Sequence, residues 1–196
     1  DAGNYIVTGG TPSFSGTANI TQANLTLTAI AQTKTYDGNT NVSNGSGYTV
    51  TGLIANESIA SVALAYDTKN AGAGNKTITI NNVVMGANTS LSNYNPIYVN
   101  NNVSTINQAN LTLTAIAQTK TYDGNTNVSN GAGYTVTGLI ANESIASVAL
   151  AYDTSSAGAG NKTITINSAV AGANTSLSNY NPLYVNSTVS TINQAV

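Results

Sequence analysis

Apolar residues alternate with small polar residues along much of this chain, a spacing typical of strands that have one buried face. Leu25, Leu27 and Ala29 are separated by Thr26 and Thr28. The same alternation occurs over residues 48–51, 62–66, 77–80 and 97–106. Because Thr and branched aliphatic residues suit a pleated, half-buried surface, we predict that these segments are strands.

The pattern is duplicated, since residues 24–109 recur almost unchanged at residues 110–195. The copies differ at nine positions, namely Ser46/Ala132, Lys69/Ser155, Asn70/Ser156, Asn82/Ser168, Val83/Ala169, Met85/Ala171, Ile97/Leu183, Asn101/Ser187 and Asn102/Thr188. A repeat of this length can bury a core of its own. We therefore expect a first repeat domain at 23–108, a second at 109–196, and the tail of a preceding repeat at 1–22.

Turn residues separate the predicted strands at the spacing seen in β-sandwiches. Asp37-Gly38, Asn44-Gly45 and Gly86-Ala87-Asn88 all contain residues that tolerate positive φ angles. Six or seven short strands in each repeat predict an all-β fold of tandem, small, immunoglobulin-like β-sandwich domains.

Residues 56–62 differ from this pattern. Asn56 is a favourable N-cap residue, Glu57 would place a negative charge in the first turn, and the following residues tolerate a helix. We expect one short helix here in each repeat. A helix packed across the sheet would make the domain mixed, so a β-grasp-like domain is the alternative fold.

The two copies are joined without a Gly-rich or Pro-rich linker. Residues 103–116 run from the end of the first copy into the second as predicted strand. An extended connection limits bending, whereas a Gly/Ser linker permits it. We expect neighbouring repeats to lie end to end with restricted freedom.

Composition excludes several classes of function. The chain has five Lys, no Arg, no His and a net charge of −2, so it lacks the cations that bind phosphate and guanine, and nucleic acid is not an expected partner. No apolar run approaches the roughly 20 residues that span a bilayer, and we expect no membrane insertion. Cys is absent, so disulfide bonds cannot stabilise the domains.

The segment Lys34-Thr35-Tyr36-Asp37-Gly38 recurs at residues 120–124. Together with Gly52-Leu53, Tyr66-Asp67 and Asn93-Tyr94, it resembles the YDG-type repeats of large bacterial surface adhesins, whose layout the MBG-type repeats share. The resemblance implies an extracellular protein, at the bacterial cell surface or secreted. It also implies a stalk module that carries a distal adhesive region and has no catalytic residues.

The candidate site residues are Tyr36, Asp37 and Gly38, with their copies Tyr122, Asp123 and Gly124. A ligand or calcium contact is one interpretation. A core tyrosine followed by a turn is favoured, because Asp-Gly is among the strongest tight-turn signals. Calcium requires several carboxylates among six to eight oxygen ligands, and each repeat has only Asp37, Glu57 and Asp67, so we expect no metal and no cofactor.

Catalysis is not expected, because the chain has no His or Cys and its Ser and Thr lack a paired base. An intramolecular Lys–Asn isopeptide bond would require a buried Lys beside an Asn and a carboxylate. Lys34 and Lys76 recur in both copies, as do Glu57 and Asp67, but Lys is rarely buried unless it is paired.

The predicted function is a stalk or spacer of a bacterial cell-surface adhesin, whose expected partners are neighbouring repeats in the same chain. A host ligand would then bind elsewhere in the full protein. The alternative is a multivalent module that binds a host glycan or protein, which would need a concave or aromatic site in each copy.

Overall fold

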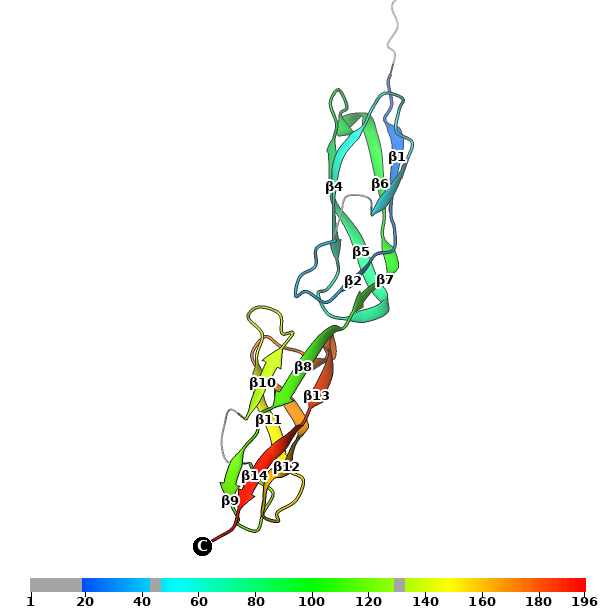
Figure 1. Ribbon diagram of the computed structural model, residues 1–196. Helices are drawn as coiled ribbons and strands as arrows, with labels where there is room; N and C mark the ends of the chain where they lie inside the picture. Colours follow the sequence, from blue (N-terminus) through cyan, green and yellow to red (C-terminus); the bar gives the residue numbers. More distant parts are fainter. Residues whose placement is uncertain (1–18, 43–46, 129–132) are drawn as a thin grey trace, which may run out of the picture.

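The computed structural model describes residues 19–42, 47–128 and 133–196, which form two elongated β domains arranged end to end (Figure 1). The expected tail of a preceding repeat at 1–22 falls largely on residues 1–18, outside this described part. The first repeat comprises β1 (Ala23–Ala29), β2 (Thr33–Thr35), β3 (Tyr48–Thr51), β4 (Ile59–Tyr66), β5 (Gly72–Met85), the 3-10 helix η2 (Leu91–Asn93), β6 (Tyr94–Val99) and β7 (Asn101–Asn107).

The second repeat has the same order of elements. They are β8 (Ala109–Ala115), β9 (Thr119–Thr121), β10 (Tyr134–Thr137), β11 (Ile145–Tyr152), β12 (Gly158–Ala171), η3 (Leu177–Asn179), β13 (Tyr180–Val185) and β14 (Ser187–Asn193). The prediction of tandem all-β domains is therefore confirmed.

Each repeat contains two sheets that share a core. In the first repeat the sheets have the strand orders β3-β1-β6 and β2-β7-β5-β4, and the second repeat has the equivalent sheets. β1 is antiparallel to β3 but parallel to β6, and β2 is parallel to β7. The sheets are thus mixed, whereas the sheets of immunoglobulin domains are antiparallel.

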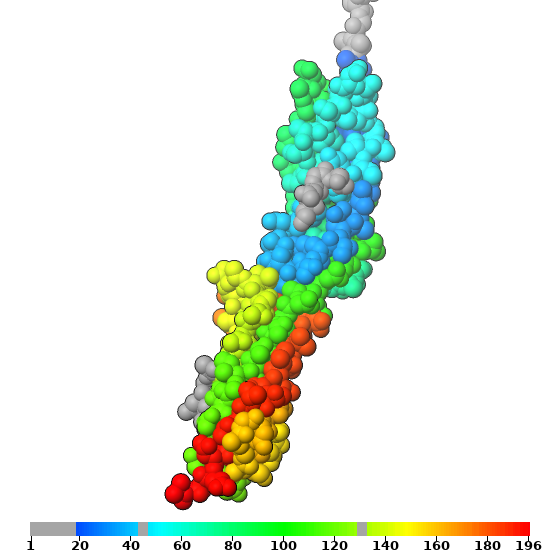
Figure 2. All heavy atoms as spheres, in the orientation of Figure 1, coloured from blue at the N-terminus to red at the C-terminus, as the bar shows by residue number. Residues whose placement is uncertain are grey.

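The parallel pairs explain the end-to-end arrangement. The entering strands β1 and β2 run in the same direction as the leaving strands β6 and β7. The chain consequently enters each repeat at one end and leaves it at the other. Only Gln108 separates β7 from β8, so the second repeat begins where the first ends, and Figure 2 shows the pair as consecutive parts of one elongated body.

Strand alternation builds the core as the sequence predicts. Leu25, Leu27 and Ile78 are fully buried, while Thr26 and Asn24 on the other face of β1 remain at least partly exposed. Full burial of one such aliphatic side chain contributes about 1.5–3 kcal/mol. Pro96, which has no N–H to donate, lies in β6 at the edge of its sheet, where proline is tolerated.

The prediction of a helix over residues 56–62 is wrong. Asn56 has a φ of 71° and lies in a turn that is closed by a 3.1 Å hydrogen bond from Glu57 N to Ile54 O. From Ile59 the chain forms β4, which pairs with β5 between Ile59 and Tyr66 with two register shifts. A helix would have left the edge of β5 unpaired, so pairing within the sheet outweighs the weak local preference for a helix. Without this helix, the β-grasp-like alternative is not supported.

Candidate functional site

The Tyr-Asp-Gly motif of the first repeat lies at the end of that repeat which faces the second. It follows β2, and Tyr36 N donates a 2.8 Å hydrogen bond to Asn107 O at the end of β7. Gly38 has a φ of 80°, a left-handed conformation that glycine adopts without strain. The motif is thereby fixed beside the connection between the repeats (Figure 1).

Lys34 holds the motif in shape from within the same repeat. Its Nζ donates 2.7 Å hydrogen bonds to Asp37 Oδ1 and to Asn39 O, and it lies 5.2 Å from the centre of the Tyr66 ring. Partial burial acts to raise the pKa of Asp37, but the hydrogen bonds from Lys34 and from the Asn39 N–H outweigh it and lower that pKa. Lys120 and Asp123 make the same 2.7 Å contact in the second repeat.

A shared carboxylate connects the two repeats. The hydroxyl groups of Tyr36, from the first repeat, and Tyr180, from the second, both donate hydrogen bonds to the carboxylate of Glu143. The two rings meet edge to face, with centroids 5.5 Å apart and an interplanar angle of 79°, a favoured geometry for aromatic pairs. Burial, followed by the hydrogen bond to Glu143, raises the pKa of each tyrosine to about 12.

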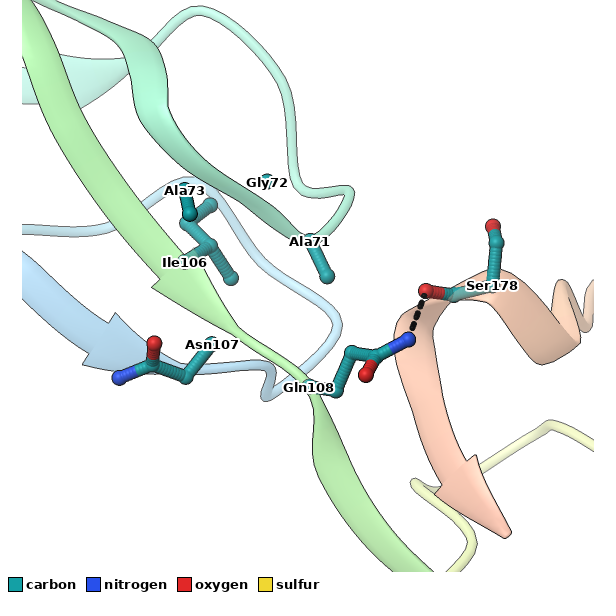
Figure 3. Close-up of a pocket in the computed structure, with 7 residues that line it drawn as sticks. All are labelled: Ala71, Gly72, Ala73, Ile106, Asn107, Gln108 and Ser178. Carbon is teal, nitrogen blue, oxygen red and sulfur yellow. Dashed lines mark hydrogen bonds between the residues drawn. The ribbon is translucent and has the colours of Figure 1, made fainter.

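Amide groups form a second set of contacts across the same boundary. Asn179 Oδ1 accepts a 2.9 Å hydrogen bond from Ala71 N, and its Nδ2 donates a 3.2 Å bond to Asn70 Oδ1. Gln108, between the repeats, donates a 3.0 Å bond from Nε2 to Ser178 O beside a 270 Å³ cavity (Figure 3). Gln22 makes the equivalent bond to Ser92 O in the first repeat.

We call this boundary the junction. Its C-terminal face, from the first repeat, consists of Tyr36, Gly38, Asn70 and Ala71; its N-terminal face, from the second repeat, consists of Ile140, Glu143, Asn179 and Tyr180. The faces fit closely, since a Cβ atom added to Gly38 would lie 2.9 Å from Ile140 Cγ2.

The duplication provides an internal measure of what the junction covers. Tyr36 is 2% exposed, whereas its copy Tyr122, at the far end of the second repeat, is 46% exposed. Asn179 is 2% exposed, whereas Asn93 at the outer end of the first repeat is exposed. The residues of each pair have identical local sequences, so the difference in exposure comes from the neighbouring repeat.

The family model of the YDG domain matches residues 21–101 and again residues 107–188. The chain belongs to the YDG family. Comparison with curated proteins and with solved structures gave no match.

A loop within each YDG repeat positions the N-terminal face. Ile140 N donates a 3.0 Å hydrogen bond to the Tyr180 hydroxyl oxygen, and Glu143 N donates a 3.1 Å bond to Ile140 O. Asn142 has a φ of 68° between them. The same bonds occur at Ile54, Glu57 and Tyr94. Contacts inside each repeat therefore hold its carboxylate in position, whether or not a neighbouring repeat contacts it.

The other candidate residues of the YDG repeats lie apart from one another. Glu57 accepts a hydrogen bond from Tyr94, and Asp67 Oδ1 accepts a 3.2 Å bond from Thr77 N. Lys34 contacts residues of its own loop, and Lys76 is buried beside Gly72. Within residues 19–42, 47–128 and 133–196, no group of three or more potential metal-ligating acidic side chains gathers, and no helix is long and apolar enough to cross a membrane.

Sequence reasoning identified Tyr36, Asp37 and Gly38 but missed Glu143, Asn179 and Tyr180. Their copies Glu57, Asn93 and Tyr94 have the same sequence context. Nothing in the residue types distinguishes a carboxylate that receives a neighbour's tyrosine from one that does not. Glu143 lies in the loop before β11, and Asn179 and Tyr180 lie where η3 meets β13, at the opposite end of the repeat from the motif.

Proposed function

We propose that these YDG repeats form a structural, non-enzymatic stalk or spacer of a bacterial cell-surface adhesin and project a distal adhesive region from the cell. The observation that carries the proposal is the junction, in which the Tyr-Asp-Gly motif of one repeat contacts the Glu143 carboxylate and Tyr180 of the next. A stalk needs to gain length with each module and to resist folding back, and both requirements follow from the geometry.

Length follows from strand direction. The 14 residues of β5 run along the repeat, and at about 3.3 Å per residue they span on the order of 45 Å. Because the chain enters one end and leaves the other, each added repeat extends the body rather than widening it. An extracellular location at the bacterial surface is part of the same proposal and is supported by the family resemblance.

Stiffness follows from the junction and the short connection. One residue, Gln108, joins the strands, and hydrogen bonds to Glu143 and Asn179 restrain the second repeat at points away from it. A hinge at Gln108 would have to break these contacts and expose the Tyr36 ring. Bending therefore has an energetic cost that a flexible linker lacks.

Distance measurements in solution test the stalk. The chain has no Cys, so a variant that combines Thr51→Cys with Thr137→Cys accepts spin labels at two equivalent exposed strand positions, one in each repeat. Dipolar spectroscopy should give one narrow distance distribution. Adding Tyr36→Ala should broaden it, whereas the matched control Tyr122→Ala should leave it unchanged; a broad distribution in the parent protein would refute a restrained junction.

The binding-module alternative and the cellular location need separate measurements. Saturable binding of the isolated chain to a glycan array or to host cells would favour the alternative. Antibodies against the chain should label intact source bacteria, and surface proteolysis should remove the signal. Labelling only after cell lysis would contradict the proposed location.

A further inference from the structure

The entering and leaving strands of each repeat run side by side in the same direction. β1 pairs in parallel with β6 over six consecutive residue pairs, from Ala23 opposite Tyr94 to Thr28 opposite Val99. β2 follows β1 toward the other end of the repeat and pairs in parallel with β7 over three more. In the second repeat β8 lies beside β13, and β9 lies beside β14, in the same way (Figure 1).

A buried serine continues this pairing where the chain passes from one sheet to the other, between β1 and β2 and between β6 and β7. Gln32 O accepts a 2.9 Å hydrogen bond from Thr105 N. Gln32 N donates a 3.0 Å bond to the Oγ of Ser104, which is fully buried. Gln118 and Ser190 make the equivalent 3.1 Å bond in the second repeat. Entering and leaving strands are therefore bonded across the step as well as on both sides of it.

Tension along the chain acts on this pairing in one direction. It pulls the entering strands at one end of the repeat and the leaving strands at the other end. Because these strands are parallel, they can separate under this tension only by sliding past each other along their own axes. The hydrogen bonds of a parallel ladder are evenly spaced, so sliding loads all of them at once. Strands that are pulled apart from one end lose their bonds one after another.

The connection between the repeats passes the tension directly from one repeat to the next. Only Gln108 separates β7 from β8, so the last leaving strand of the first repeat continues as the first entering strand of the second. Residues 36–93 lie between the entering and leaving strands in sequence. They carry no tension as long as the parallel pairing holds, and the same applies to residues 122–179 of the second repeat.

We propose that each repeat is a load-bearing unit, in which the parallel pairing of entering and leaving strands resists unfolding when the chain is pulled along its length. Ser104 and Ser190 complete this pairing in the first and second repeats. The inference rests on the proposed function for the source of the tension, because a stalk that is fixed to a cell and bound at its tip is pulled from both ends. The pairing itself lies inside each repeat and does not depend on the junction.

Single-molecule force spectroscopy in two pulling directions tests the inference. Handles on the two ends of the 196-residue chain shear the parallel pairing of both repeats. The chain has no Cys, so Ser61→Cys combined with Asn82→Cys places handles on exposed residues of β4 and β5. These positions lie near the open end of an antiparallel hairpin, which this pulling direction unzips.

End-to-end pulling should require a several-fold higher force than unzipping at the same loading rate, because forced unfolding follows the unfolding rate along the pulled direction. Each end-to-end event should lengthen the chain by about 250 Å, since residues 23–107 extend to about 300 Å from a folded length on the order of 45 Å. Equal forces in the two directions would overturn the inference. The spin-label distances report on the junction alone, so the stalk proposal stands or fails separately.

Matched variants locate the resistance within the repeat. Ser104→Ala removes the acceptor of Gln32 N and should lower the force of one of the two unfolding events, and Ser190→Ala should do the same for the other repeat. Val83→Ala is the control, because it shortens a buried side chain of β5 outside the loaded strands, and the second repeat already has Ala169 there. It should lower the free energy of unfolding in urea and leave both forces unchanged. Unchanged forces for Ser104→Ala, or an equal loss for Val83→Ala, would assign the resistance to the core as a whole and overturn the inference.

Discussion

Replacing Tyr36 with Ala should destabilise the pair of repeats far more than replacing Tyr122, although the two residues have the same local sequence. The exposed fractions of 2% and 46% imply that the junction covers about 44% of the Tyr36 surface, roughly 90 Å² of a large aromatic residue. At about 25 cal/mol per Å², this burial contributes about 2 kcal/mol. The hydrogen bond to Glu143 adds about 1 kcal/mol, below the range of about 1.5–3 kcal/mol that is usual for a charged acceptor, because Glu143 is partly exposed.

The assay is equilibrium urea unfolding, followed by circular dichroism and fitted with a nearest-neighbour model for the two repeats. Tyr36→Ala should lower the total free energy of unfolding by about 3 kcal/mol more than Tyr122→Ala does. Taking the difference between the two variants cancels the contribution of the contacts that each tyrosine makes inside its own repeat. Equal losses for the two variants, within about 0.5 kcal/mol, would refute the argument that the junction couples the repeats.

Three further predictions address the junction and its support. Gly38→Ala should lower the free energy of unfolding in urea by about 1–2 kcal/mol more than Gly124→Ala does. Both glycines have positive φ, but only at Gly38 would the added Cβ lie against the neighbouring repeat. The junction should loosen as the pH rises. The pKa of each junction tyrosine is about 10 in the unfolded chain and about 12 in the folded protein. The stabilisation is therefore complete below pH 10 and lost as the pH passes 12, and spin-label distances measured at pH 8–12 would detect the change. Lys34→Met should raise the pKa of Asp37 toward its ordinary value, as measured by NMR titration, and lower stability by about 1 kcal/mol; an unchanged pKa would contradict the assigned role of the lysine.

Much of the fold could be predicted from residue alternation. Leu25, Leu27 and Ile78 are buried where period two places them, because strand geometry fixes which side chains share a face. The prediction of a helix over residues 56–62 was wrong because it was based on local sequence alone. Its local signals are weak preferences, and pairing with β5 satisfies most of the backbone of Ile59–Tyr66.

The junction could not be predicted because burial there depends on a neighbour and not on local sequence. Interpreting Tyr36 as a core residue describes the first repeat, yet the identical Tyr122 is half exposed. Glu143 gave no signal either, since Glu57 has the same surroundings in sequence. Only the strand directions, which place the end of one repeat against the start of the next, decide which copy is covered.

The differences between the copies indicate which junction contacts tolerate change. Tyr36, Gly38 and the four residues of the N-terminal face are the same in both repeats, whereas Asn70 becomes Ser156. Ser156 has no side-chain amide like the one through which Asn70 bonds Asn179, a contact worth about 0.5–1.5 kcal/mol, but the second repeat keeps the backbone N–H of Ala157 and the hydroxyl of Tyr122. The junction contacts that both repeats could make are therefore those of the tyrosine hydroxyl, the carboxylate and a backbone N–H, whereas the amide bond of Asn70 is an addition that the second repeat lacks.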